Sequence, residues 1–212
     1  MKLVCISDTH TRHALIQELP EGDVLIHAGD SCNNGSAEDL DFFLSWFSNQ
    51  PHKEKILIAG NHDWVFERHP DQARRMVEDH DIIYLCDEST IIDGVKFYGS
   101  PYQPEFCNWA FNKRRGEELK KIWKKIPKDT DVLITHGPPH GILDETEMTR
   151  EPVGCGDLLV AVKRVKPKVH IFGHIHDAYG VKKIGKTTFI NASQLDDHYR
   201  LQNEFKPIVF EL

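Results

Sequence analysis

The stretch Val169–Asp177, Val-His-Ile-Phe-Gly-His-Ile-His-Asp, decides how the chain is interpreted. Its first four residues are typical of a short buried strand, which a glycine ends. His174 and His176 follow two residues apart, and residues i and i+2 of an extended chain lie on one face. Two imidazoles at the mouth of a strand are suited to binding a metal ion, but such a pair alone is a weak signal. The interpretation therefore depends on partners elsewhere in the chain.

The same pattern occurs at four further places: a short apolar strand ends, and a side chain that can bind a metal follows at once. The four further strands are expected at Lys2–Ser7, Val24–Ala28, Lys55–Ala59 and Asp131–Thr135. The candidate ligands that follow the five strands are Asp8 and His10, Asp30, Asn61, His136, and His174 with His176. His62 comes directly after Asn61 and is a further candidate for the site.

These side chains are expected to meet, because loops at the carboxyl ends of strands in an α/β sheet converge on one edge. Four histidines, two aspartates and one asparagine are too many ligands for one ion. They suit two divalent ions, with an aspartate bridging them. Mixed imidazole and carboxylate ligands suit Mn, Fe, Zn, Co or Ni better than Mg or Ca, and the lack of thiolates in the set argues against a structural zinc site.

Strands alternate with helices along the chain, which predicts an α/β layered fold. Helices are expected at Ala14–Leu19, about 37–49, Asp71–Asp79, Arg115–Ile126 and Asp157–Val165. Further strands are expected at Ile82–Leu85 and Pro207–Leu212, hairpins at 91–98 and 183–192, and loops at Ser100–Asn112 and 140–156. Since no repeat or linker is evident, residues 1–212 are interpreted as one domain.

The totals exclude several classes of protein. The chain has 212 residues and a formal net charge of −7, which argues against a protein that binds duplex nucleic acid through its phosphates. Its five cysteines form no Cys-x-x-Cys pair, which favours reduced thiols in a reducing compartment. The apolar run Leu3–Ile6 is too short for a signal peptide, and no stretch is long enough to span a membrane. A soluble, cytoplasmic protein is expected.

Five blocks of residues together resemble the calcineurin-like metallophosphoesterase superfamily, in the same order and over nearly the whole chain. The blocks are Asp8-Thr9-His10, Gly29-Asp30, Gly60-Asn61-His62-Asp63, Thr135-His136-Gly137 and Gly173-His174-Ile175-His176. Three further stretches, Gly99–Pro104, Asn108–Asn112 and Val153–Gly156, resemble the subfamily of brain-expressed metallophosphoesterase-domain proteins and their bacterial relatives. That subfamily is similar to class III cyclic-nucleotide phosphodiesterases.

The resemblance implies a four-layer α/β/β/α sandwich and a site with two metal ions. By that resemblance, Asp30 bridges the ions and His62 faces the substrate from outside the coordination shell. The other ligands divide between a first metal, held by Asp8, His10 and His176, and a second, held by Asn61, His136 and His174. Some relatives lack the first histidine of the Gly-His-x-His block; His174 is present here, so an intact second metal site is expected.

The expected activity is that of a phosphodiesterase that hydrolyses small phosphodiesters, with cyclic nucleotides as candidates. A hydroxide shared by the two ions would attack phosphorus in line. His62 would donate to a phosphate oxygen or protonate the leaving alkoxide, and Asp63 would orient His62 or favour its protonated form. In the aromatic loop, Tyr102, Phe106 and Trp109 either wall a pocket for a base or pack on one another.

Two alternatives remain open from the sequence. The same site would serve a phosphomonoesterase or a nuclease, although no added nucleic-acid domain is evident. A protein of another class, a scaffold that keeps the fold and has lost catalysis, usually shows eroded ligands, and here none is missing. The sequence leaves the oligomeric state and the physiological substrate undetermined.

Overall fold

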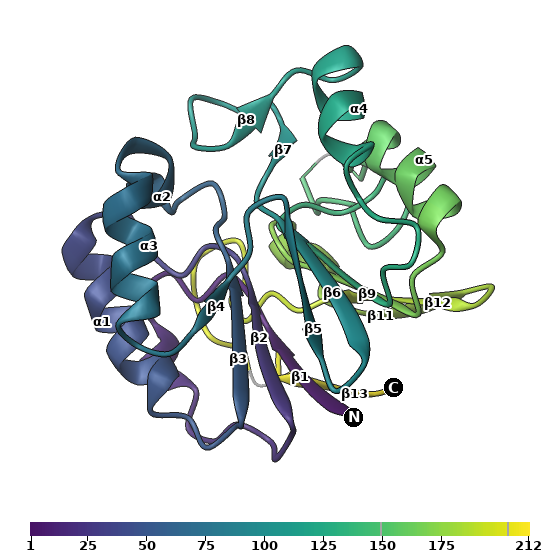
Figure 1. Ribbon diagram of the computed structural model, residues 1–212. Helices are drawn as coiled ribbons and strands as arrows, with labels where there is room; N and C mark the ends of the chain where they lie inside the picture. Colours follow the sequence, from purple (N-terminus) through teal and green to yellow (C-terminus); the bar gives the residue numbers. More distant parts are fainter. Residues whose placement is uncertain (149, 203) are drawn as a thin grey trace.

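The computed structural model describes residues 1–148, 150–202 and 204–212. Its first sheet has the strand order β13-β1-β2-β3-β4. Its strands are β1 (Lys2–Ile6), β2 (Val24–Ala28), β3 (Glu54–Ile58), β4 (Ile83–Tyr84) and β13 (Ile208–Glu211). The first four are parallel, and β13 pairs antiparallel with β1, so the two ends of the chain lie side by side (Figure 1).

The second sheet has the order β11-β12-β10-β9-β6-β5. Its strands are β5 (Glu88–Ile92), β6 (Val95–Ser100), β9 (Val132–Thr135), β10 (Val169–Phe172), β11 (Gly180–Ile184) and β12 (Thr187–Asn191). The four inner strands are parallel, and the outer two are antiparallel arms of the hairpins that the sequence predicts. Asp93 and Gly94 form the first hairpin turn with φ of 48° and 81°, as the favoured two-residue turn with positive φ at both residues requires.

Helices cover the outer face of each sheet, and the two inner faces pack on each other (Figure 1). On the first sheet lie α1 (Ala37–Ser48), α2 (Trp64–Arg68) and α3 (Pro70–Glu78), and on the second lie α4 (Glu117–Trp123) and α5 (Gly156–Val165). In β1, Leu3 faces the other sheet while Val4 faces the helices, because successive side chains of a strand alternate. The strands are therefore buried on both faces, and the predicted four-layer α/β/β/α architecture is confirmed.

Two local predictions are wrong, and one helix was not predicted. The helix expected at Ala14–Leu19 is only a 3₁₀ turn, η1 (His13–Leu15), because Pro20 disfavours helical backbone before it and so short a helix cannot offset its nucleation. Helix α2 was not predicted, because its five residues are too few to show a helical period in the sequence. The expected loop at Ser100–Asn112 contains a strand, β7 (Gln103–Pro104), which pairs with β8 (Asn112–Lys113).

Two expectations from composition can be compared with the structure. All five cysteines are free thiols, as expected. Over the described residues, every helix is too short or too polar to span a membrane.

Candidate metal centre

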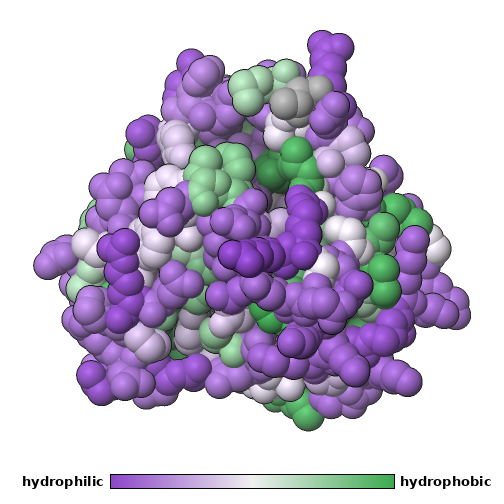
Figure 2. Space-filling view, turned by 90° about the horizontal axis from the view of Figure 1, so that it is seen from above, coloured by the Kyte–Doolittle hydropathy of each residue, from purple (hydrophilic) through white to green (hydrophobic). Residues whose placement is uncertain are grey.

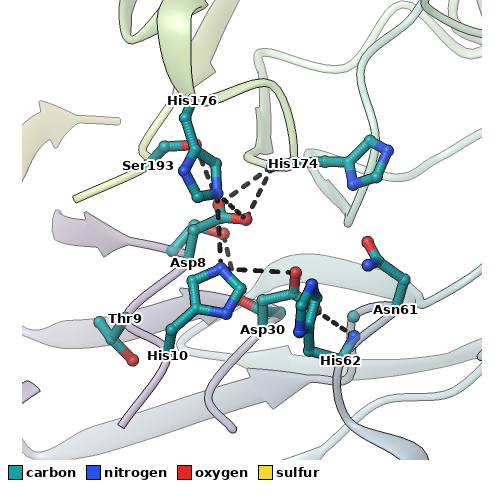
Figure 3. A network of polar contacts seen from close by, with 12 residues as sticks. Asp8, Thr9, His10, Asp30, Asn61, His62, His174, His176 and Ser193 are labelled. Carbon is teal, nitrogen blue, oxygen red and sulfur yellow. Dashed lines mark hydrogen bonds and ion pairs between the residues drawn. The ribbon is translucent and has the colours of Figure 1, made fainter. Parts of the chain in front are cut away.

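Strands β1, β2, β3, β9 and β10 end at one edge of the two sheets, which for β1, β2 and β3 is their upper end in Figure 1. The loops that follow bring all the predicted ligands together. In the close view, His176 and Ser193 lie around Asp8, while Asn61 and His174 lie on the other side of the group (Figure 3). Ligand atoms fall within 4.8 Å of one another in three groups, which are Asp8–His10–His176, Asp30–His136–His174 and His10–Asp30–His62.

The first group surrounds the buried Asp8 carboxylate. Its Oδ1 atom lies 3.4 Å from Nε2 of His176, and Nε2 of His10 lies 3.4 Å from the same His176 nitrogen. Burial raises the pKa of Asp8, but the neighbouring His176 more than offsets this and holds it well below its usual range. Asp8 is therefore a carboxylate facing two imidazoles, which is a donor set suited to a divalent transition metal.

The second group meets the first at Asp30. Its Oδ2 atom lies 3.4 Å from Nε2 of His136 and 3.7 Å from Nε2 of His10, so one carboxylate reaches both groups. Asn61 joins through Oδ1, 2.9 Å from the same His136 nitrogen. The His174 ring lies 4.9 Å from that of His136. This is the position that a bridging carboxylate would take.

Two histidines are oriented by backbone carbonyls behind them. Nδ1 of His136 donates to the carbonyl of Ala28 at 3.0 Å, and Nδ1 of His176 donates to the carbonyl of Asp196 at 2.8 Å. With the proton on Nδ1, the Nε2 lone pair of each ring is directed at the carboxylates and is free to bind a metal. The donor set and its orientation therefore fit a pair of divalent ions.

The charge balance of the centre agrees with this. Burial would lower the pKa of His136, but the Asp30 carboxylate more than offsets it and raises the pKa to about 9. For His176 the hydrogen bond to Asp8 opposes burial in the same way and raises the pKa to about 9. Two carboxylates thus attract positive charge to these rings, and a divalent cation would satisfy the same attraction.

Four of the predicted ligands have left-handed backbone, which non-glycine residues adopt rarely. They are Asp8, His10, Asp30 and His174, with φ of 53°, 41°, 57° and 69°. This backbone turns the chain sharply at the end of a strand. It also corrects the expectation that His174 and His176 share one face of extended chain: His176 begins a 3₁₀ turn, η2 (His176–Ala178), and the two rings join different groups.

A glycine precedes three of the ligands because a neighbouring ligand side chain occupies the space of its Cβ. A Cβ at Gly29 would lie 2.5 Å from Nδ1 of His136, and one at Gly60 or Gly173 would strike the carboxylate of Asp30 or Asp8. The glycines of these blocks were not explained from the sequence. A glycine that recurs directly before a candidate ligand is a sequence signal of this close packing of side chains.

The Asp63 carboxylate does not pair with the His62 ring, and that expectation is wrong. Its Oδ2 atom accepts the backbone N–H groups of Gly60 at 2.8 Å and Asp30 at 2.9 Å, and its Oδ1 atom accepts that of Cys32 at 2.8 Å. These donors are fixed amides at the ends of β2 and β3, and they use the oxygens that would have met an imidazole. Asp63 instead holds the two ligand-bearing loops together.

His62 is oriented by other partners. Its Nδ1 atom donates to the carbonyl of Asn33 at 2.7 Å, and its ring stacks on Trp109. Its backbone N–H donates to Oδ1 of Asp30 at 2.7 Å. The ring stands edge-on to that of His10 with centroids 4.6 Å apart, so His62 lies beside the ligands.

Three residues that follow β12 also belong to the centre and were not among the candidates from the sequence. Ser193 donates its hydroxyl to Oδ2 of Asp8 at 2.9 Å, Asp196 supplies the carbonyl behind His176, and the Tyr199 ring packs edge-on against His10 at 4.7 Å. None belongs to a recognisable block. Since a backbone carbonyl can come from any residue type, the sequence carried no signal for Asp196.

A cavity of about 430 Å³ adjoins the centre, with His174 and His176 in its wall. Of the three loop aromatics, Phe106 lines this cavity, Trp109 stacks on His62, and Tyr102 packs against Phe111 with centroids 5.7 Å apart. Seen from above, the surface is mostly hydrophilic, with hydrophobic side chains in separate patches, one of them above the middle of the view (Figure 2).

Comparison with known proteins agrees with this geometry. The family model described as calcineurin-like phosphoesterase matches residues 1–178. This chain belongs to that family. The phosphoesterase is 44% identical over 222 residues to UPF0046 protein K07C11.7 of Caenorhabditis elegans, covering 99% of this chain and 74% of the relative. It is 41% identical over 233 residues to the human Metallophosphoesterase domain-containing protein 1, covering 100% of this chain and 71% of the relative.

The fold is also found among solved structures. Phosphopantetheinyl Hydrolase (PptH) from Mycobacterium tuberculosis superposes with a TM-score of 0.61 at 14% identity, covering 98% of this chain and 95% of that one. At this identity the likeness concerns the fold alone. The family match makes the chain a metal-dependent phosphoesterase, and the family generally binds two divalent metals and acts on small phosphoester substrates.

Proposed function

We propose that this phosphoesterase hydrolyses small phosphodiesters, cyclic nucleotides among them, at the centre described above. The observation that carries the proposal is the position of Asp30, whose carboxylate reaches two separate groups of imidazoles. Asp8, His10 and His176 would hold one divalent ion, Asn61, His136 and His174 the other, and Asp30 both. The donors suit Mn, Fe, Zn, Co or Ni. Two such ions, when bound, supply an activated water and neutralise charge that develops on the phosphoryl oxygens.

His62 is proposed as the general acid. Because its Nδ1 proton is donated to the Asn33 carbonyl, Nε2 carries a proton only in the imidazolium form. Giving that proton to the leaving oxygen would return the ring to the neutral tautomer that the Asn33 carbonyl already favours. The stacked indole of Trp109 keeps the ring from rotating away. Both contacts therefore serve a directional proton transfer from Nε2.

A diester is favoured over a monoester by the cavity beside the ligands. A monoester needs room for one alcohol, whereas a diester carries two substituents on phosphorus. The cavity of about 430 Å³ that begins at His174 and His176 offers a place for the second one. Its volume falls within the range of roughly 300–1,000 Å³ of small-molecule pockets, so it suits an organic group such as a nucleoside.

A turnover panel tests this proposal. With Mn²⁺ added, 2′,3′- and 3′,5′-cyclic nucleotides and bis(p-nitrophenyl) phosphate should be hydrolysed with higher kcat/KM than p-nitrophenyl phosphate and single-stranded DNA. A preference for the monoester would favour a phosphomonoesterase, and cleavage of DNA alone would favour a nuclease. No hydrolysis of any diester would overturn the proposal.

A further inference from the structure

The cavity beside the metal centre has an unequal distribution of charge. Apart from the two metal-site histidines, its described lining has three carboxylates, those of Glu105, Asp177 and Asp197, and one cation, Arg115. The side chain of Asp197 is 53% exposed and 3.7 Å from Nε2 of His198, which neutralises it only when protonated. Away from the metal centre, a group that enters the cavity therefore meets more negative than positive charge.

The one cation in the described lining is committed to the backbone. One terminal nitrogen of Arg115 donates to the carbonyl of Gly154 at 2.8 Å, and the other donates to the carbonyl of Val153 at 2.7 Å. These bonds hold the guanidinium against the 153–154 segment. The two bonds take up two of its five N–H donors, which reduces what Arg115 can offer to a second phosphate in the cavity.

The remaining walls are apolar. Phe106, Pro138 and Ile175 line the cavity together with the Tyr199 ring. Apolar and aromatic surface of this kind takes up a flat or compact neutral group. The walls favour burial of an organic substituent, and the carboxylates act on whatever charge it carries.

We propose that the cavity holds the second ester group of the substrate and that its carboxylates select a neutral or cationic group against one that bears a further phosphate. This inference rests on the proposed diesterase function. It names the substrate class as phosphodiesters of an uncharged nucleoside or of an amino alcohol. It disfavours nucleic-acid strands and nucleotides with a second phosphate, which would place an anion among Glu105, Asp177 and Asp197.

A matched pair of chromogenic substrates tests the selection. Thymidine 5′-(p-nitrophenyl phosphate) and its 3′-phosphorylated form differ only in the added anion. In wild-type protein at about pH 8, kcat/KM should be about ten-fold lower for the phosphorylated form. The difference should shrink as salt rises from about 20 to about 300 mM, because screening weakens exposed charges but does not relieve a steric clash.

Two variants locate the effect. The quantity to compare is the ratio of kcat/KM for the unphosphorylated substrate to kcat/KM for the phosphorylated one. Asp197→Asn and Glu105→Gln should each reduce this ratio by about three-fold at low salt, and the double variant should reduce it further. The same variants should lower kcat/KM for p-nitrophenyl phosphorylcholine, whose choline group is cationic. Asp41→Asn, an exposed carboxylate on α1 over the other sheet, is the matched control and should leave all ratios unchanged.

The outcomes separate the two proposals. Equal turnover of the matched pair in wild-type protein, or a ratio that the cavity variants leave unchanged, overturns the charge selection while the diesterase function stands. A ratio that is insensitive to salt assigns the discrimination to shape and also overturns it. Failure to hydrolyse even the unphosphorylated diester rejects the proposed function, and the selection with it.

Discussion

The imidazole of His62 stacks on the indole of Trp109, with ring centroids 4.0 Å apart and planes inclined by 28°. The loop that carries Trp109 is itself fixed, since the N–H of Ala110 donates to the carbonyl of Asn61 at 3.1 Å. The indole and the ligand loop after β3 therefore keep a constant relation. Trp109 acts on His62 as a positioning residue.

Replacing Trp109 by alanine is expected to lower kcat by about ten-fold, because the loss of roughly 1 kcal/mol of ring stacking frees the His62 side chain to rotate. Metal content should stay the same, since the indole contacts none of the proposed ligands except through His62. Trp109→Phe should recover most of the activity. Steady-state kinetics with bis(p-nitrophenyl) phosphate and metal analysis check this, and an equal loss in the two variants would contradict it.

His62 and Asp30 should separate catalysis from metal binding. His62→Ala is expected to keep its metal and to lose kcat by about 100-fold, the usual size of general-acid catalysis. Asp30→Ala should lose metal as well as activity, because its carboxylate reaches both imidazole groups. Elemental analysis of dialysed protein beside kcat is the measurement. Metal loss in His62→Ala would instead assign His62 to the ligands, as its group with His10 and Asp30 allows.

Asp63 is expected to contribute strongly to the free energy of unfolding. Its buried carboxylate accepts backbone N–H groups from both ligand loops, and the amide nitrogen of Asp63→Asn cannot accept them. The cost is expected to be about 3 kcal/mol in the free energy of unfolding, as for lost hydrogen bonds to a buried charge. Urea denaturation measures it. Asp157→Asn is a comparison, since its carboxylate accepts one N–H, that of Gly116, at 2.8 Å.

The sequence predicted the strands, and it predicted which side chains lie together at the candidate metal centre, because both have local signals. A short apolar run marks a strand buried on both faces, and a polar residue directly after it marks the edge where Asp8 and Asp30 lie. The signal for helix α1 was equally local, because Ser36 accepts the N–H of Asp39 at the start of the helix. These features depend on residues within one turn or one strand of each other.

What the sequence did not predict depends on contacts between distant segments. Ser193 and Asp8 are 185 residues apart, and Asp196 orients His176 through its carbonyl, which no residue type marks. The role given to Asp63 was wrong for the same reason: adjacency to His62 in the chain favoured a contact, whereas the amides of the neighbouring loop took its oxygens. Side-chain partners across loops require the assembled fold.

His170 is not one of the proposed metal ligands, and it provides a test of how stability depends on pH. Its Nε2 atom lies 2.8 Å from the hydroxyl oxygen of Thr135, whose own proton is donated to the carbonyl of Gly137 at 2.8 Å. Nε2 therefore carries the ring proton and Nδ1 is unprotonated. Nδ1 is buried without a hydrogen-bond partner in the described residues, and burial lowers the pKa of His170 to about 3.

Because this pKa is lower in the folded chain than the ordinary value of 6.5, the unfolded chain binds the extra proton and acid favours unfolding. The contribution of His170 to stability is complete above pH 6.5 and is lost as pH falls from there toward 3. Within that range the free energy of unfolding should fall by about 1.4 kcal/mol per pH unit for this one histidine.

His170→Gln, which can still donate to Thr135 but does not titrate, should be less stable at pH 7 and less sensitive to acid. Urea denaturation between about pH 7 and pH 5 measures both slopes. The exposed His198→Gln serves as control and should keep the wild-type slope; if His170→Gln keeps it too, the ring is not held neutral in the fold.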